Sequence, residues 1–237
     1  MKYGTLYSYW SHEWVCDYPA VAKKVRAAGC DILEVGAPHI AAMTDAQLAE
    51  LKAAAEDNGL ILTTNIGPSK DQDLASPDPA IRKNGLDFLT GVLRAMDKIG
   101  SKSLVGAMYS FWPCDFKYTD KEAAWDTSIA EMKKLAAVAE DLGIDLCQEV
   151  LNRFETYIMT NAAEGVEYCK RVDSPRCKVL LDTFHMNIEE DNIPAAIRLT
   201  GDYLGHIHVG EANRKRPGQG SLDWKAIAAA VHDVHYD

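Results

Sequence analysis

Four segments of this 237-residue chain share one order: a helical pattern, a glycine, and then a short run of apolar and β-branched residues. The segments are VRAAGCDILEVG, AAEDNGLILTTN, MDKIGSKSLVGA and AEDLGIDLCQEV, with glycines at Gly29, Gly59, Gly100 and Gly143. Each glycine is expected to adopt the left-handed conformation that closes a helix before the chain turns into a strand. Helices and strands that alternate at this rhythm indicate right-handed βαβ units and a parallel sheet.

Three further runs complete the expected sheet. YGTLYSY lies near the start of the chain, and KVLLD and LGHIH follow helical stretches expected around residues 161–172 and 190–200. Seven strands are therefore predicted. No linker rich in Pro, Gly or Ser divides them, so the sequence predicts a single domain over residues 1–237.

The motifs between the strands distinguish an open sheet from a barrel. Neither G-x-G-x-x-G nor G-x-x-x-x-G-K-[ST] follows a strand, which removes the commonest phosphate-binding loops of open sheets. Polar residues gather instead at the carboxyl ends of many strands, as a barrel active site requires. We predict an α/β fold, a (β/α)8 TIM-type barrel. Its eighth βα unit is absent, and the domain is expected to be truncated before strand eight, because the chain stops at AVHDVHYD just after a helix beginning near Trp224.

Composition limits the partners that such a domain can have. The formal net charge of −10 disfavours a broad nucleic-acid or anionic-membrane surface, because both need clustered Lys and Arg. Six scattered cysteines without a C-x-x-C pair favour reduced thiols over a disulfide framework or a zinc ribbon. The start MKYGTLYSYW does not read as a signal peptide, and no run approaches the roughly 18 apolar residues of a membrane span. We expect a cytoplasmic protein with a small-molecule partner.

Three consecutive strands end in residues that can bind a metal. Glu149 ends an apolar strand, where a carboxylate costs free energy unless a proton, a cation or a metal compensates it. Asp182 ends KVLLD and His208 ends LGHIH, and the alternation of side chains along a strand allows all three to face inward. Two carboxylates and an imidazole suit Mn²⁺, Co²⁺, Mg²⁺ or Zn²⁺. We predict that Glu149, Asp182 and His208 bind one divalent ion.

Each of these residues also has a structural interpretation. Strand-end Asp and Glu residues often cap the following helix, and carboxylates inside a barrel can pair with Lys or Arg. The occurrence of all three at one rim favours metal binding over these structural roles. His206 lies one layer deeper than His208, where a hydrogen-bonded core histidine is the expected role.

Further polar and aromatic residues follow the strand ends on loops, which carry specificity in barrels. His185 could hold a hydroxyl or an oxyanion, and Arg214 could hold a carboxylate or the oxygen of a polyol. Lys215 and Arg216 are expected to be solvated loop charges. Aromatic residues could wall a small pocket, although they more often belong to a core. The predicted substrate-binding residues are Tyr7, Trp112, Glu155, His185 and Arg214, and Trp10 and Trp14 are further aromatic candidates.

Six motifs, in the same order and at the same spacing, give the chain a resemblance to a known family. They are YSYW, SPDPAIRKN, YSFWP, EVLNRFETY, LLDTFHMNIEED and GHIHVGEANRKRPGQG, which extend from about Gly4 to the end. The sequence resembles the ketose 3-epimerases, the family of D-tagatose 3-epimerase and D-allulose (D-psicose) 3-epimerase. Long motifs in order are far more specific than any single tripeptide.

The resemblance implies an isomerase that epimerises free ketohexoses at C3, such as D-fructose/D-allulose and D-tagatose/D-sorbose. It implies one metal, commonly Mn²⁺ or Co²⁺, held by Glu149, Asp182, His208 and a further glutamate. In such enzymes Glu149 and that glutamate act on opposite faces of C3, and a cis-enediolate forms between the two proton transfers. The resemblance also implies ketose contacts from Glu155, His185 and Arg214, and a homodimer or homotetramer.

The sequence departs from the family in one respect. The fourth ligand belongs to a strand-eight motif similar to V-V-M-E-P-F, which does not occur before the chain stops at Asp237. Glu211 is an unsuitable substitute, because it lies in a loop three residues after His208. Two alternative functions stay open: a related sugar isomerase or inosose dehydratase, and an inactive sugar- or metal-binding barrel if the chain truly ends at Asp237.

Overall fold

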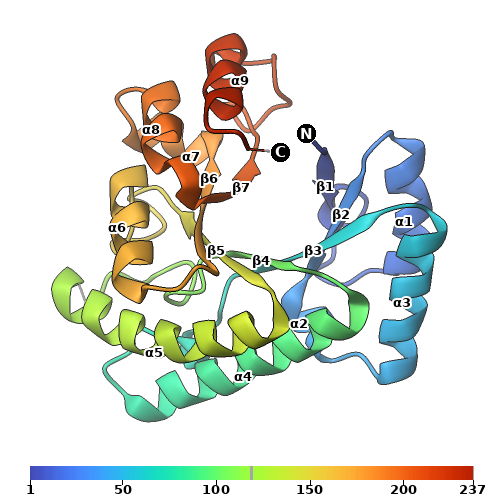
Figure 1. Ribbon diagram of the computed structural model, residues 1–237, viewed down its shortest axis with the longest axis horizontal. Helices are drawn as coiled ribbons and strands as arrows, with labels where there is room; N and C mark the ends of the chain where they lie inside the picture. The colour runs from blue at the N-terminus through green and yellow to red at the C-terminus, as the bar shows by residue number, and fades with distance from the viewer. Residues whose placement is uncertain (118–119, 237) are drawn as a thin grey trace.

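Seven parallel strands form one curved sheet in the computed structural model, which describes residues 1–117 and 120–236. Each strand pairs with the next in chain order, so the sheet wraps in the manner of a barrel wall (Figure 1). The strands are β1 (Gly4–Leu6), β2 (Ile32–Gly36), β3 (Ile61–Ile66), β4 (Ser103–Gly106), β5 (Asp145–Val150), β6 (Cys177–Asp182) and β7 (Leu204–His208). The prediction of seven parallel strands is confirmed, and the chain supplies seven of the eight βα units of a (β/α)8 barrel.

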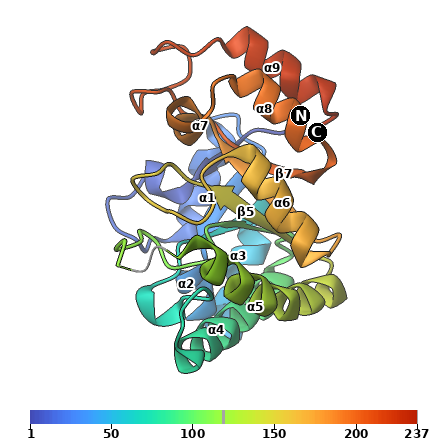
Figure 2. The same cartoon turned by 90° about the vertical axis from the view of Figure 1, so that its left-hand side faces the viewer.

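Helices cover the outer face of this sheet (Figures 1 and 2). They are α1 (Tyr18–Ala27), α2 (Ala37–Ala41), α3 (Asp45–Asp57), α4 (Pro79–Ile99), α5 (Lys121–Leu142), α6 (Ala162–Val172), α7 (Thr183–Glu189), α8 (Ile193–Thr200) and α9 (Trp224–Asp233), with 3-10 turns η1 (Tyr7–Tyr9), η2 (Lys70–Gln72) and η3 (Gly201–Tyr203). Gly100 and Gly143 end α4 and α5 with φ of 75° and 64°, as the sequence predicted. Within the described residues, no helix combines the length and the apolar character needed to cross a membrane.

Two apolar layers lie on opposite faces of the sheet. The main core fills the space between strands and helices, with residues such as Leu33, Val35 and Val179 fully buried. A separate small cluster of Val105, Cys147 and Leu180, each 0% exposed, lies inside the curved wall. In β5 and β6 the inward-facing residues Cys147 and Leu180 are followed two positions later by Glu149 and Asp182 at the strand ends. The floor of the site is therefore apolar and its rim is acidic.

The pairing of β6 with β7 contains an irregularity. Leu204 of β7 pairs with Val179 of β6. The next residue of β6, Leu180, pairs with His206, so that Gly205 has no partner in this ladder. Gly205 is therefore an extra residue on β7, as in a β-bulge. Leu204 packs in the outer core, whereas His206, two positions on, turns toward the barrel interior. The bulge thus sets which face the last residues of β7 present.

The edges of the sheet are β1 and β7, which face each other near the two ends of the chain (Figure 1). A cavity of about 830 Å³ lies between them, lined by β1, the end of β7 and α9. It extends inward to Glu34, His206 and His208.

Candidate metal centre and sugar site

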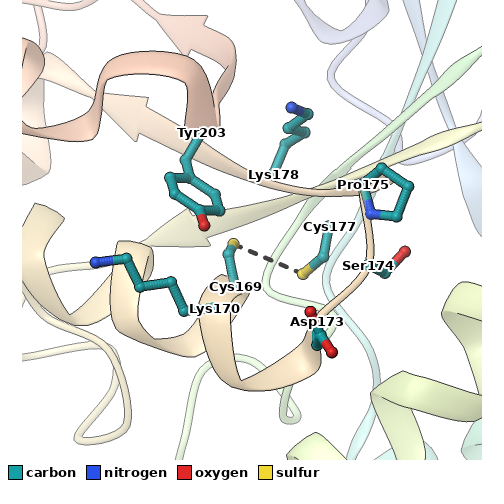
Figure 3. A pocket seen from close by; sticks show the side chains of 8 residues that line it. All are labelled: Cys169, Lys170, Asp173, Ser174, Pro175, Cys177, Lys178 and Tyr203. Carbon is teal, nitrogen blue, oxygen red and sulfur yellow. Dashed lines mark hydrogen bonds between the residues drawn. The ribbon is translucent and has the colours of Figure 1, made fainter.

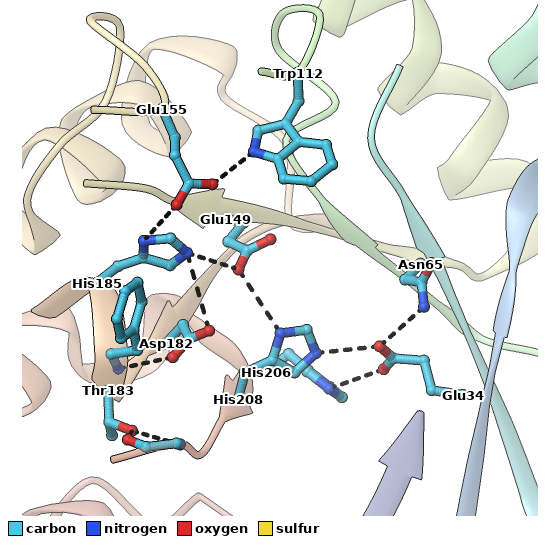
Figure 4. Close-up of polar contacts among 12 residues, drawn as sticks. Glu34, Asn65, Trp112, Glu149, Glu155, Asp182, Thr183, His185, His206 and His208 are labelled. Carbon is cyan, nitrogen blue, oxygen red and sulfur yellow. Dashed lines mark hydrogen bonds and ion pairs between the residues drawn. The ribbon is translucent and has the colours of Figure 1, made fainter. Parts of the chain in front are cut away.

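Glu149, Asp182 and His208 come together at the carboxyl ends of β5, β6 and β7 (Figure 4). The strand register explains this, because Asp182 pairs directly with His208, and Glu149 pairs with Leu180 two residues before Asp182. One potential ligand atom from each residue lies within 4.8 Å of the others. The arrangement brings together the three residues that the sequence pattern selected as ligands.

Asp182 uses its two carboxylate oxygens differently. Oδ1 accepts the backbone N–H of Phe184 at 2.8 Å and so caps α7. Oδ2 faces the site, 3.8 Å from Arg214 Nη1. Burial, with the negative charge of Glu149 as a second cause, raises the pKa of Asp182. One side chain therefore caps a helix and also presents a carboxylate oxygen to the site.

Glu149 has only long contacts with the neighbouring imidazoles. Its Oε1 lies 3.7 Å from His208 Nδ1 and 3.8 Å from His185 Nε2, both beyond the usual hydrogen-bond range. A half-buried carboxylate separated in this way from its neighbours leaves room for a cation between them. The donor set of two carboxylates and one imidazole fits a divalent ion such as Mn²⁺ or Co²⁺.

The ring of His208 connects this cluster to the opposite side of the barrel. Its Nε2 lies 3.1 Å from Oε1 of Glu34, a residue in the middle of β2 that is 4% exposed. Burial by itself would lower the pKa of His208, but the charges of Glu34 and Glu149 raise it well above its usual range. The sequence interpretation missed Glu34, although a lone acid within the apolar strand ILEVG is the same kind of signal that selected Glu149.

His185 is held by the loop that follows β5. The backbone N–H of Asn152 donates to Nδ1 of His185 at 3.1 Å, which places the proton of the neutral ring on Nε2. That Nε2 lies 3.8 Å from Glu149 and 4.0 Å from Asp182. His185 therefore presents an N–H group to the site. Asn152 was not among the sequence-based candidates, because nothing in a loop asparagine indicates a partner 33 residues away.

Glu155 and Trp112 meet at the mouth of the barrel. The indole Nε1–H of Trp112 donates to Glu155 Oε2 at 2.8 Å, and the amide of Asn152 donates to Glu155 Oε1 at 3.0 Å. Arg214 stacks its guanidinium 3.4 Å from the ring centre of Phe184 and lies 3.9 Å from Glu155. These residues surround the cluster of Glu149, Asp182 and His208 on its open side, as expected for loops above a barrel rim.

The remaining aromatic and basic candidates lie outside this group. Tyr7 is 3% exposed, and its hydroxyl donates to the carbonyl of Trp14 at 2.8 Å, so only its ring is available to wall a pocket. The Trp14 side chain is 79% exposed, and Trp10 is half-buried with its ring edge against Tyr9. Lys215 and Arg216 are exposed loop residues.

Glu211 has a structural role in the loop after β7. It is 0% exposed and accepts hydrogen bonds from Trp224 Nε1 at 2.5 Å and from the backbone N–H of Gly218 at 2.6 Å. These contacts fix the loop to the start of α9. The carboxylate is therefore committed to the loop, in agreement with its exclusion as a fourth ligand.

A smaller cavity of about 410 Å³ lies at the opposite end of β6 (Figure 3). Cys169 and Cys177 line it, with their sulfur atoms 3.6 Å apart, and all six cysteines are free thiols. Because Cys177 begins β6 and Asp182 ends it, this cavity is remote from the acidic rim. It plays no part in the candidate metal centre.

Comparisons with known proteins agree with the fold and with the family that the motifs indicated. Residues 22–237 match the family described as xylose isomerase-like TIM barrel. The chain is 49% identical to D-psicose 3-epimerase of Ruminiclostridium cellulolyticum and 46% identical to that of Agrobacterium fabrum, covering 100% of this chain and 81% and 82% of those relatives. A crystal structure of D-psicose 3-epimerase with D-tagatose from Clostridium cellulolyticum superposes with a TM-score of 0.98 at 49% identity, over 100% of this chain and 82% of that one.

Proposed function

The chain belongs to the ketose 3-epimerase family of isomerases, and from this premise we propose that it epimerises free ketohexoses at C3 with the help of one divalent metal ion. The substrates proposed are the pairs D-fructose/D-allulose and D-tagatose/D-sorbose. The relatives named as D-psicose 3-epimerases support the reaction. The observation that carries the proposal is the meeting of Glu149, Asp182 and His208 within 4.8 Å at three adjacent strand ends.

These three side chains would hold the ion, with Mn²⁺ or Co²⁺ proposed and Mg²⁺ as an alternative. When bound, the ion would supply positive charge beside the substrate oxygens at C2 and C3, which makes the C3 proton more acidic and stabilises negative charge on those oxygens. Glu149, Asp182 and His208 provide the oxygen and nitrogen donors that such an ion prefers.

Glu149 is proposed as the base that removes the proton from C3. Its carboxylate is half-buried and is the acid at the rim with only long contacts to neighbouring rings, so one oxygen is available for a substrate proton. Removal of that proton leaves a cis-enediolate. Returning a proton to the same face restores the original sugar, whereas epimerisation requires a donor on the opposite face. The family resemblance assigns that second role to a glutamate of an eighth strand.

The loops above the rim are proposed to bind the sugar. His185 offers its Nε2–H to a hydroxyl or a developing negative oxygen, because the backbone of Asn152 occupies the other ring nitrogen. Glu155 and Arg214 offer an acceptor and a donor to hydroxyl groups, and Trp112 presents an apolar face that is partly exposed. Tyr7 contributes only its ring in this proposal.

The assembly and location follow the same premise. We propose a homodimer or homotetramer, as the resemblance implies, in a reducing compartment such as the cytoplasm. The cysteine spacing supports the compartment, because six scattered cysteines without a C-x-x-C pair do not form the pattern of a disulfide framework. Light scattering of the purified protein measures the assembly directly.

Hydrogen exchange in D₂O tests the proposed reaction. The protein, loaded with Mn²⁺ or Co²⁺, should incorporate deuterium at C3 of D-fructose, and chelation of the metal should stop the incorporation. Exchange at C1 would assign an aldose–ketose isomerase instead. Calorimetric binding of the ketose without exchange at any carbon would assign a sugar-binding barrel.

A further inference from the structure

Glu34 is a buried carboxylate that the proposed reaction does not use directly. It lies in the middle of β2, faces the barrel interior and is 4% exposed. Its Oε2 accepts the Thr63 hydroxyl at 2.9 Å and lies 3.3 Å from His206 Nε2. Its Oε1 lies 3.1 Å from His208 Nε2 and accepts the Asn65 amide at 3.4 Å. Both oxygens therefore have fixed partners (Figure 4).

The contact with His208 determines which ring nitrogen carries a proton. An ionised carboxylate can only accept hydrogen bonds, so Nε2 of His208 must be the donor. In the neutral ring, Nδ1 then has a lone pair, and Nδ1 is the atom directed at Glu149, 3.7 Å away. One imidazole thus donates to a carboxylate on β2 and offers a ligand atom to the cluster at the ends of β5 and β6.

We propose that Glu34 is a positioning residue that holds His208 with Nε2 protonated and Nδ1 turned toward Glu149 and Asp182, ready to bind a divalent cation. The inference rests on the metal centre of the proposed function and adds a residue to it. A carboxylate behind a metal-binding imidazole fixes the tautomer and the ring orientation and makes the ligand nitrogen more basic.

The surroundings of Glu34 make it a rigid anchor. β2 and β3 are paired with Glu34 opposite Thr63, and the Thr63 hydroxyl fixes the carboxylate from the neighbouring strand. β7 does not pair with β2, since its described partner in the sheet is β6. The Glu34–His208 contact therefore links β7 to β2 through side chains, across 174 residues of sequence.

A different role for the same residues is a separate cation site. Glu34, His206 and His208 also have potential ligand atoms within 4.8 Å of one another. The hydrogen bonds from Thr63 and Asn65 occupy the carboxylate on both oxygens, which favours the positioning role. The two roles differ in stoichiometry, because positioning requires one ion per chain and a separate site adds a second.

The test compares two variants at position 34 with a matched control. Glu34→Ala removes the acceptor, and Glu34→Gln keeps the shape and an amide oxygen that can still accept from Nε2. Thr64→Val is the control. Thr64 lies on β3, the strand next to the one that carries Glu34, and this substitution removes a buried hydrogen bond to Ser101 without touching His208. Two readouts are used, both on protein prepared without metal: ¹⁵N NMR of His208 while the pH is raised, and calorimetric titration with Mn²⁺.

In the wild-type protein, His208 should keep its remaining proton on Nε2, and one Mn²⁺ should bind per chain. Glu34→Ala should shift the ring toward the Nδ1–H form and weaken Mn²⁺ binding by about 10- to 100-fold. Glu34→Gln should retain the Nε2–H form and lose less affinity, and Thr64→Val should match the wild type in both readouts.

Three results would overturn the inference. An unchanged tautomer in Glu34→Ala, or Mn²⁺ affinity equal to wild type, would remove the positioning role while the metal centre stands. A second ion lost in Glu34→Ala would make Glu34 a ligand of its own site. Absence of any Mn²⁺ binding by the wild type would overturn the metal centre and the inference with it.

Discussion

The indole N–H of Trp112 donates to Oε2 of Glu155 at 2.8 Å, which joins the loop after β4 to the loop after β5. The second oxygen of the same carboxylate accepts from Asn152 at 3.0 Å. Glu155 is therefore oriented before any sugar arrives, and a group held in place in this way loses less conformational entropy on binding.

Trp112→Phe should weaken ketose binding by about three- to tenfold, because the ring stays but the hydrogen bond to a charged group is lost. Calorimetric titration with D-allulose in the presence of Mn²⁺ measures the change. Trp125→Phe, in α5, is the matched control, since it also loses an indole donor, but to the carbonyl of Ile158 and not to Glu155. Equal affinity in Trp112→Phe and wild type would show that Glu155 needs no such support.

Glu149→Gln should impair chemistry more than sugar binding. The amide keeps the shape of the side chain but cannot accept the C3 proton, and a general base contributes about 10²- to 10⁴-fold. The rate of deuterium incorporation at C3 in D₂O, measured by NMR, should fall by at least about 10²-fold. The affinity for the ketose at saturating Mn²⁺ should change much less. Undiminished exchange would assign the proton transfer to another residue.

The substrate should be an unphosphorylated sugar. Arg214 is stacked on Phe184 and directed toward the carboxylates of Glu155 and Asp182, so it is not the centre of a phosphate clamp. D-Fructose 6-phosphate should bind at least about tenfold more weakly than D-fructose, since a dianion would enter an acidic rim. Tighter binding or faster C3 exchange with the phosphate ester would contradict this assignment.

Metal binding should strengthen as the pH rises. The pKa of His208 is raised by the charge of Glu34 against the opposing effect of burial, and burial with Glu149 raises the pKa of Asp182. Both groups must lose a proton before they bind a cation, so protons compete with the metal at low pH. Mn²⁺ titrations should show affinity rising by up to about tenfold per pH unit while one proton is displaced, and continuing to rise above the usual pKa of histidine. A flat profile would exclude His208 as a ligand.

Epimerisation should depend on a second proton-transfer group. A polypeptide limited to residues 1–237 should exchange the C3 proton but epimerise slowly, because Glu149 acts on one face. A version extended through one further βα unit that brings a glutamate to the rim should epimerise faster, by about 10²- to 10⁴-fold. Comparable production of D-allulose from D-fructose by the two forms would show that the second glutamate is unnecessary.

Most of the fold could be predicted because its signals are local. A left-handed glycine after a helix, an apolar run, and the next helix are each encoded within a dozen residues, and the seven strands follow from their repetition. The three rim residues were found for the same reason, since a strand end in a parallel barrel has a known direction. Their roles as ligands stay predictions.

The residues that were missed act through long-range contacts. Glu34 contacts His208 across 174 residues of sequence, and Asn152 contacts His185 across 33. The periodicity of a helix or strand does not relate residues at such separations. Tyr7 shows the opposite limitation: its position near the end of β1 was visible in sequence, but the occupation of its hydroxyl by the Trp14 carbonyl was not. Tertiary packing decides which side of a residue remains available.

The bulge at Gly205 implies an unequal tolerance to mutation. Removing this residue would leave Leu204 opposite Val179 and His206 opposite Leu180, so the histidines would keep their partners in an uninterrupted ladder. Adding a side chain is different, because a Cβ at this position would lie 2.5 Å from Lys178 Cβ and 2.7 Å from Cys147 Sγ. Such a clash would push β7 away from β6 and separate His208 from Asp182. Among natural variants of this chain, a one-residue deletion at position 205 should therefore preserve metal binding better than the conservative replacement by alanine.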